Sequence, residues 1–527
     1  AYDMGTTSVK TCLYYIHSEI ELVASASEGY PLNVLPNGGA EQNPEDWWNA
    51  VCLTTRQVID ESGLAPSAVS GISFCTQMQG LVLVDEKGAP VRPAMNYMDQ
   101  RAGKELKKGL SYGLRIAGCN VTKLARSLVI TKAVAASVKD PVWKYKWVEK
   151  NEPEQFAKVR YWLDVKEYLI HRCTGEFVMT ADSAFSTMLY DIRKNRKNIS
   201  QSMCKMHGVQ YRHFPPLIKS TDKAGKLTVS AADAMGLCPD IPVFGGGGDA
   251  SLIGVGAGAV GLHSTHIYSG TSGWVSTVVD KPMVDVSSKI AAVVGANSGF
   301  YNYFAELETA GKCLEWVKDH LALDEIDIYL EKKHVSDSHE TLYKSLYDYM
   351  MYVVSQIPAG SSGVIFTPWL HGNRCPFEDS NARGMFINIG LDTGKTELIR
   401  SVLEGVCYHM RWMLEAQEKK TKTSETIRFV GGGALSPVTC QILADVLGRK
   451  LETVENPQNV GAVGAAITAA AGLGIIDGIG QAKKLVLPNH TYTPYGCNRN
   501  IYDAGYKVYK NLYRDNRKSF AACNSLL

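Results

Sequence analysis

Two short segments built around a Gly-Thr pair lie about half a chain apart in this sequence. Residues 3–8 read DMGTTS, and residues 268–273 read YSGTSG. Strand-forming residues flank each segment, so both predict a strand, a tight turn and a returning strand. A similar hairpin that recurs about half a chain later indicates duplication of one domain type. The chain is therefore expected to fold as two related α/β domains.

The length supports this division, because 527 residues exceed what one hydrophobic core organises. Hydrophobic residues make up 45% of the chain and charged residues 20%, an ordinary globular balance. We expect an N-terminal domain over residues 1–242 and a C-terminal domain over residues 243–480. A connector and a polar helix would follow over residues 481–527, after a boundary near Pro242.

The charge balance excludes several classes of partner. The formal net charge is +2, from 55 basic and 53 acidic residues. Such a balance argues against nucleic-acid and membrane-surface partners. The basic run at 193–197 is interpreted as a solvated turn, and the Ala/Gly-rich stretch at 461–480 as a packed helix. Tyrosine-rich residues 347–352 are interpreted as a helix face.

The cysteines indicate a compartment. There are 13 of them, an odd number, and none forms a CxxC pair. That scatter is typical of reduced thiols and not of a disulfide framework or a zinc site. With no signal peptide visible at the start, we expect a cytoplasmic protein.

Local patterns predict the elements around these features. Asn43-Pro44 is a helix start, Gly175 a helix stop, and the turn at 86–88 follows a short strand. Residues 81–84 are expected to pair with a buried strand reached from residues 68–74. The other expected strands are 11–16, 20–25 and 426–430, and the expected helices are 45–62, 141–151, 167–174, 437–448 and 503–516.

The two Gly-Thr turns are candidate phosphate sites. Small residues let backbone N–H groups and hydroxyls approach a phosphate closely. An acidic residue just ahead of the first turn, Asp3, can hold a metal ion that neutralises phosphate charge. No GxxxxGK[ST] pattern is present, so this is not a Walker loop. Each turn alone could equally be a plain hairpin, but a facing pair could clamp one nucleotide.

Four glycines precede Asp249 in the segment Gly245–Asp249. Without side chains around it, an acid here can reach into a cleft and accept a proton from a substrate hydroxyl. Phosphoryl transfer needs such a base, together with charge neutralisation. The alternative is a flexible glycine linker with an incidental acid, and the small apolar residues that follow favour a built site.

Residues Gly431–Ala434 read GGGA, between an expected strand and an expected helix. Strand, glycine turn and helix together are a usual nucleotide-binding arrangement. The pattern is not GxGxxG, so dinucleotide binding is a weaker alternative, and a close-packed structural turn remains another.

Taken in order, these motifs resemble those of the FGGY carbohydrate kinases, and most of all their xylulokinase-like branch. The resemblance runs from residue 1 to about residue 475. It rests on the whole series DMGTTSVK, EQNPEDWW, CTQMQGLVLVDEKGAPVRPAMNYMDQRA, PVWKYKWVEKNEPE, GGGGDAS, SGTSG, GVIFTPWLHGNRCPFEDSNARGMF and VGGGALSPVTCQILADVLG.

The resemblance implies an α/β fold of two ribonuclease H-like, actin-like ATPase domains with a deep cleft between them. Sugar would bind the first domain, and MgATP mainly the second. It implies ATP and Mg²⁺ as requirements, small molecules as the partners, and an oligomeric state left open, with a homodimer among the options.

The resemblance also implies roles for individual residues. Asp249 would be the catalytic base, and Asp3 would lie beside Mg²⁺ and the transferred phosphate. Sugar contacts would come from Met78, Gln79 and Asp99, with Asp249 at the reacting hydroxyl. The phosphates and adenosine would be held by Gly5, Thr6, Thr7, Gly270, Thr271, Gly431, Gly432, Gly433 and Ala434.

Three departures from the family pattern bear on the acceptor. Gln79 stands where xylulokinases usually have His, Met98 where they have Asn, and Asn373 where the family commonly has Glu. The first two changes could alter the preferred sugar, because a site built to pair a hydroxyl discriminates strongly. The third concerns local support of the cleft.

We therefore expect transfer of the γ-phosphoryl group of ATP to a ketopentose, with D-xylulose to D-xylulose 5-phosphate as the leading reaction. L-xylulose, ribulose and sugar alcohols remain alternatives. A non-catalytic regulator on the same fold and an actin- or chaperone-like ATPase are the rivals. The retained Asp3, Asp249 and Gly-Thr turns argue against the first, and the sugar segments against the second.

Overall fold

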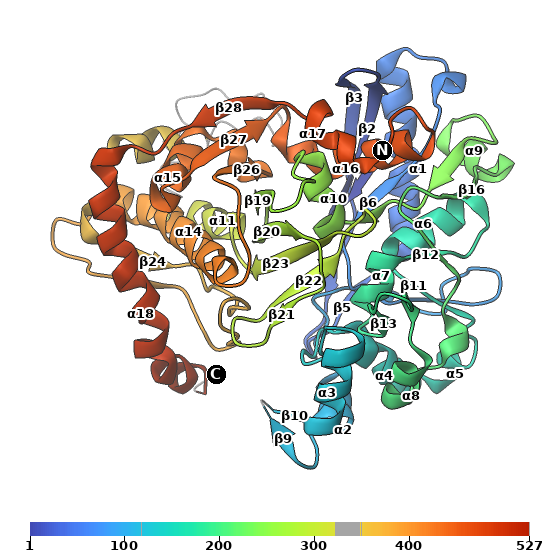
Figure 1. Ribbon diagram of the computed structural model, residues 1–527, viewed down its shortest axis with the longest axis horizontal. Coiled ribbons are helices and arrows are strands. Elements are labelled where there is room, and N and C mark those ends of the chain that lie inside the picture. The colour runs from blue at the N-terminus through green and yellow to red at the C-terminus, as the bar shows by residue number, and fades with distance from the viewer. Residues whose placement is uncertain (117, 322–347, 349, 526–527) are drawn as a thin grey trace.

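The computed structural model describes residues 1–116, 118–321, 348 and 350–525. Figure 1 shows two lobes, with the early blue-to-green segments in one and most of the yellow-to-red segments in the other. Each lobe contains one large sheet, as the duplicated hairpins predict.

The first sheet has the strand order β18-β6-β1-β2-β3. Strands β1 and β2 are the antiparallel hairpin expected around the first Gly-Thr turn, with Tyr2 opposite Thr11. Strand β6 runs parallel to β1 on one side and to β18 on the other. The bounds are β1 Tyr2–Met4, β2 Ser8–Ile16, β3 Ile20–Gly29, β6 Phe74–Thr76 and β18 Gly247–Gly248.

The second sheet has the order β21-β22-β23-β20-β19-β26-β27-β28. Strands β19 and β20 are the antiparallel hairpin expected around the second Gly-Thr turn. Strand β26 runs parallel to β19 and has the predicted bounds. The bounds are β19 Thr265–Ser269, β20 Gly273–Val279, β21 Val284–Asp285, β22 Ile290–Val294, β23 Tyr301–Leu307, β26 Thr426–Val430, β27 Lys450–Val454 and β28 Pro488–Tyr492.

Helix ends follow the capping residues seen in the sequence. The Asn43 side chain accepts a hydrogen bond from the Glu45 N–H at the start of α1, and Gly63 ends that helix with φ 65°. Gly175 and Gly448 end α6 and α15 in the same way. The bounds are α1 Pro44–Ser62, α4 Pro141–Asn151, α6 Val165–Thr174, α7 Ala181–Ser186, α10 Asp249–Gly256, α14 Lys395–Glu418, α15 Pro437–Leu447, α16 Val460–Gly472 and α18 Arg499–Asn524.

Two local expectations differ from the structure. Strand β7 (Val82–Val84) pairs with β11 (Tyr161–Leu163) and not with β6, so the predicted pairing of residues 81–84 is wrong. Strand β6 is central in its sheet, and β1 and β18 already occupy both of its edges. The last helix is also longer than the predicted 503–516, and the buried Tyr502 and Phe520 continue its apolar face at the two ends.

Several interpretations of short segments hold. The basic run at 193–197 is a turn between two short strands. Of the Ala/Gly-rich stretch at 461–480, only the part up to residue 472 belongs to a buried helix, over residues 460–472. Of the tyrosine-rich stretch, residues 350–352 are helical, while 347 and 349 lie outside the described residues. All thirteen cysteines lie in the described part of the chain and are free. No helix in the described ranges has the length and apolarity that a membrane crossing requires.

Helices α10 and α16 lie between the two sheets (Figure 1). Their apolar residues share one core cluster with Cys75 of the first sheet and Val430 of the second. Gly464 lets the helices approach closely, since a Cβ there would lie 2.3 Å from the Leu252 carbonyl oxygen. Asp249 is the first residue of α10, so the segment that joins the lobes also carries the predicted base.

Candidate active site

A cavity of about 500 Å³ brings together segments that lie far apart in the sequence. The first Gly-Thr turn lines it with Gly5, Thr6 and Thr7, and the second with Thr271 and Ser272. Asp249 lines the same cavity. The two turns therefore face one space, as the paired-hairpin hypothesis requires. The predicted sugar residues Met78 and Gln79 also line it, together with Asp3.

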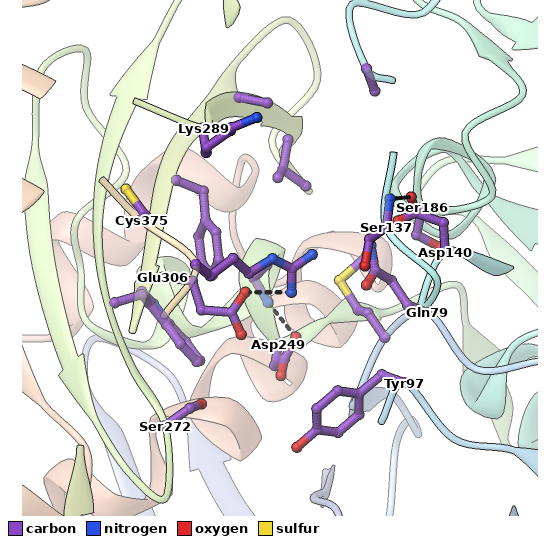
Figure 2. A pocket seen from close by; sticks show the side chains of 18 of the residues that line it. Gln79, Tyr97, Ser137, Asp140, Ser186, Asp249, Ser272, Lys289, Glu306 and Cys375 are labelled. Atoms are coloured by element: carbon purple, nitrogen blue, oxygen red, sulfur yellow. Dashed lines mark hydrogen bonds and ion pairs between the residues drawn. The ribbon is translucent and has the colours of Figure 1, made fainter. Parts of the chain in front are cut away.

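Asp249 lies at the centre of the view in Figure 2, between Glu306 on one side and Gln79 and Tyr97 on the other. The backbone N–H of Ala250 donates to its Oδ1 at 2.7 Å. Burial raises the pKa of Asp249 to about 7, and the nearby charges of Glu306, Asp3 and Asp164 act in the same direction. A carboxyl group with a pKa near neutrality can both accept and release a proton at physiological pH.

The glycines before Asp249 are packed and do not form a linker. Gly246 has φ 61°, and a Cβ there would lie 2.3 Å from the Phe74 carbonyl oxygen of β6. A Cβ on Gly248 would lie 2.1 Å from Cγ of Met78. Side chains are therefore excluded by close contact with the first sheet and with the sugar segment.

Asp3 fits a Mg²⁺ site of the kind that accompanies a bound nucleotide. Burial raises its pKa to about 6, while Lys10 and the Cys75 thiol oppose that shift. A buried carboxyl group gains from a cation that neutralises it. Within the described residues no group of three or more His, Cys, Asp or Glu side chains could hold a metal ion. Mg²⁺ bound through one carboxylate and the phosphates of a nucleotide needs no such group.

The GGGA segment lies outside the lining of this cavity but beside the second turn. It forms the short helix η4 (Gly432–Leu435) after Gly431, which has φ 91°. A Cβ on Gly431 would lie 2.6 Å from the carbonyl oxygen of Ser269, and one on Gly433 would lie 2.8 Å from the Ser269 side chain. Because Ser269 directly precedes Gly270, the GGGA segment packs against the residue that leads into the second turn.

Asp99, which was expected to contact the sugar, is not among the described residues that line the cavity. Its carboxylate is fully buried and accepts from the Ala40 N–H at 2.9 Å and from Arg101 at 2.7 Å. Met98 likewise lies outside the lining. Of this segment, Tyr97 lines the cavity, and its hydroxyl lies 3.3 Å from Thr6 Oγ1. Among these neighbours, only Tyr97 therefore connects the sugar segment to the first phosphate turn.

The family models settle the class of the chain. The model described as "FGGY family of carbohydrate kinases, N-terminal domain" matches residues 1–256, and the C-terminal domain model of the same family matches residues 266–473. The chain belongs to the FGGY family of carbohydrate kinases. It is a sugar kinase, and the expected two-domain, actin-like fold is confirmed.

Relatives of this FGGY kinase act on more than one acceptor. The xylulose kinase of Bacillus subtilis is 28% identical over 97% of this chain and 95% of its own length. The gluconokinase of the same organism is 25% identical over 97% of this chain and 94% of its own length. A solved structure of ligand-bound xylulose kinase from Lactobacillus acidophilus superposes with a TM-score of 0.84 at 22% identity, over 99% of this chain and 98% of that one.

Two ion pairs line or adjoin the cavity of the FGGY kinase and were not predicted from sequence. Arg374 pairs with Glu306 at 2.9 Å, and Lys139 pairs with Glu308 at 3.1 Å. Burial raises the pKa of Glu306, and Arg374 opposes that shift. Arg374 belongs to the HGNRCP segment, which the sequence analysis had linked to support of the cleft. Glu306 stands on a plain strand and gave no such signal.

Asn373 supports the same segment from inside. Its side-chain amide donates to the carbonyl oxygens of Cys375 at 3.1 Å and Phe377 at 2.8 Å. Although Asn373 replaces the Glu that is common in the family, its buried side chain still supports the loop that carries Arg374.

Lys144 holds the two sugar segments together from behind. Its Nζ donates to the carbonyl oxygens of Gln79 and Asn96, each at 2.8 Å. Gln79 has φ 63°, an unfavourable backbone for a side-chain-bearing residue. Burial lowers the pKa of Lys144 to about 7, although the negative charges of Asp99 and Asp164 act to raise it. Sequence reasoning missed this residue because a lysine in an amphipathic helix resembles an ordinary surface cation.

Proposed function

We propose that this FGGY kinase transfers the γ-phosphoryl group of ATP to a hydroxyl of an uncharged ketopentose, with D-xylulose to D-xylulose 5-phosphate as the leading reaction. One observation carries the proposal. The half-buried Asp249 lies in a single cavity that is lined by both Gly-Thr turns and by the sugar segment around Gln79.

In this reaction Asp249 accepts the proton of the attacking hydroxyl. Its pKa of about 7 suits that task, because a base is most effective when its pKa is near the working pH. Thr6, Thr7 and Thr271 and the backbone of the turns hold the phosphates in line with that hydroxyl. The proton that leaves the sugar oxygen ends on Asp249. The new bond joins that oxygen to the γ-phosphorus, while the bond from this phosphorus to the bridging oxygen breaks and ADP leaves with the electron pair.

Asp3 would hold Mg²⁺, which supplies neutralisation of phosphate charge when bound. The glycines Gly431–Gly433 would admit the adenosine beside the second turn, where Gly431 and Gly433 pack against Ser269 and Gly432 leaves open backbone. At Gly432 an added Cβ would meet nothing within 4 Å.

The charges near Asp249 favour a neutral acceptor over a sugar acid. The carboxyl groups of Asp3, Asp249 and Glu306 all line the cavity. Arg374, the cation beside them, is already paired with Glu306 at 2.9 Å. Lys289, which also lines the cavity, lies 3.6 Å from Glu378. Among the residues that the structure describes, a substrate carboxylate would therefore meet these carboxyl groups and cations that already have acidic partners. The reaction of the gluconokinase relatives is therefore the second candidate, and it rests on their sequence similarity alone.

The test is ADP release from purified protein with MgATP and a panel of acceptors, including D-xylulose, L-xylulose, ribulose, sugar alcohols and gluconate. Strong stimulation by one neutral ketopentose supports the proposal. Stimulation by gluconate alone would overturn the neutral-acceptor assignment. ATP bound without stimulation by any acceptor would overturn the proposed reaction.

A further inference from the structure

The helix that begins with Asp249 lacks a side-chain cap of its own. Its N-cap residue is Gly248, which has no side chain to accept a hydrogen bond from the first turn. The first N–H groups of a helix need a partner, and a buried helix end without one is unfavourable. In this first turn the Ala250 N–H donates to Asp249 Oδ1 itself, so the position of Asp249 depends on what holds its neighbours in the chain.

Asp182 of α7, from another part of the first lobe, binds the residues on both sides of Asp249. Its Oδ2 accepts from the Gly248 N–H at 2.7 Å and from the hydroxyl of Ser251. Gly247 makes this approach possible, since a Cβ there would lie 3.2 Å from the same oxygen. Both donors flank Asp249, one on the preceding residue and one two residues beyond it.

Asp182 is itself fixed by a buried polar network. The carboxylate is 2% exposed, and its Oδ1 accepts from the Ser183 N–H at 3.0 Å and from the Thr180 hydroxyl. Lys166 lies 3.6 Å away and is fully buried, with its other contacts to Glu167 and Ser183 at 2.9 Å. A network in which each oxygen is satisfied by fixed donors holds a carboxylate in one position.

We propose that Asp182, supported by Lys166, is a positioning residue that holds the start of α10 through Gly248 and Ser251 and so fixes the carboxylate of Asp249 for proton transfer. Asp182 is not among the described residues that line the cavity. It acts through the backbone of Gly248 and the hydroxyl of Ser251. The inference rests on the proposed function of Asp249 as the base. Its consequence is a defect in the chemical step and not in the binding of either substrate.

The first experiment compares Asp182→Ala and Asp182→Asn in the full-length enzyme, with the acceptor that gives the highest rate in the panel. Active sites are counted by calorimetric titration with MgADP, so that a loss of folded protein does not count as a loss of rate. We expect Asp182→Ala to lower kcat per active site roughly 10²-fold, because small misplacements of a reacting group have effects of that size. The KM values for sugar and MgATP should change less than threefold.

The conservative variant provides the rescue. Asp182→Asn keeps one side-chain oxygen of the same shape, so it should recover a part of the kcat that Asp182→Ala loses. Ser251→Ala removes one donor and leaves the hydrogen bond from the Gly248 N–H to Asp182, so it should give a smaller loss in kcat. It also serves as the readable variant should Asp182→Ala fail to fold.

The matched control is Asp445→Ala in the other lobe. Asp445 is also buried, at 3% exposure, and accepts from the Tyr495 N–H and from Asn498 at 2.7 Å each. This variant should keep kcat per active site. Equal kcat for Asp182→Ala and wild type, or a loss confined to KM, would overturn the inference. If Asp249→Asn also kept full kcat, the proposed base would fail instead, and the two failures are thereby distinguished.

Discussion

At the residue scale, the carboxylate of Asp249 combines burial, a helix start and neighbouring negative charge. Replacing it with an amide of the same shape removes the proton acceptor and leaves the packing of α10 unchanged. We predict that Asp249→Asn lowers kcat by about 10²–10⁴-fold, the usual contribution of a general base. Calorimetry should show MgADP binding as in the wild type. A variant that kept more than a tenth of wild-type kcat would exclude Asp249 as the base.

The raised pKa of Asp249 predicts the pH dependence. The active form of a base is deprotonated, so activity is present above a pKa of about 7 and is lost as the pH falls through it. We expect kcat/KM to show an acid limb near that value. Glu306→Gln removes a negative charge that raises this pKa, so the limb should move to lower pH.

The control for that profile is Glu404→Gln on α14. Glu404 is more buried than Glu306, with side chains 1% and 22% exposed, and forms a comparable pair with Arg400 at 2.8 Å, outside the cavity lining. The acid limb of the Glu404→Gln pH profile should match that of the wild type. An acid limb that stays in place in Glu306→Gln would show that Glu306 does not act on the group that titrates.

At the scale of elements, helix α4 fixes the two sugar segments through Lys144. Lys144→Met keeps the length of the side chain but leaves the Gln79 and Asn96 carbonyls without their donor. Gln79 would then relax from its unfavourable backbone conformation. We predict about a tenfold rise in KM for the sugar, corresponding to the loss of a buried hydrogen-bonding partner. Steady-state kinetics with each substrate varied in turn will measure it.

Lys150→Met is the matched control on the same helix. Its side chain is 51% exposed and reaches Glu105 at 3.4 Å, away from both sugar segments. The KM for the sugar should not change in that variant. If Lys144→Met raised the KM for MgATP and for sugar equally, the effect would be general and not one of the sugar segments.

At the scale of the whole molecule, the contact of α10 with α16 connects the two sheets. A methyl group at Gly464 would meet the Leu252 backbone carbonyl, which cannot move without shifting the helix that carries Asp249. We predict that Gly464→Ala destabilises the chain by about 1–3 kcal/mol, as overpacked cores do. The midpoint of urea unfolding should fall accordingly. Gly103→Ala, where an added Cβ meets nothing within 4 Å, should leave the midpoint within error or raise it.

Much of the fold and site was predictable because local chemistry decides it. Turn and capping residues set the hairpins at both Gly-Thr segments and the bounds of α1, α4 and β26. The spacing of small residues around Asp249 indicated a built site. Strand pairing was less predictable, as β7 shows, since the partner of a short apolar strand depends on which sheet edge is free.

The sequence by itself determined the family, the two Gly-Thr turns and Asp249, because these depend on residue types at fixed short spacings. The tertiary structure decided which residues surround them. It placed Tyr97 in the cavity and Asp99 behind it, paired Arg374 with Glu306, and brought Asp182 and Lys144 under the site. Contacts of this kind join residues far apart in the chain, and their energies depend on burial and distance, which arise only when the lobes are packed.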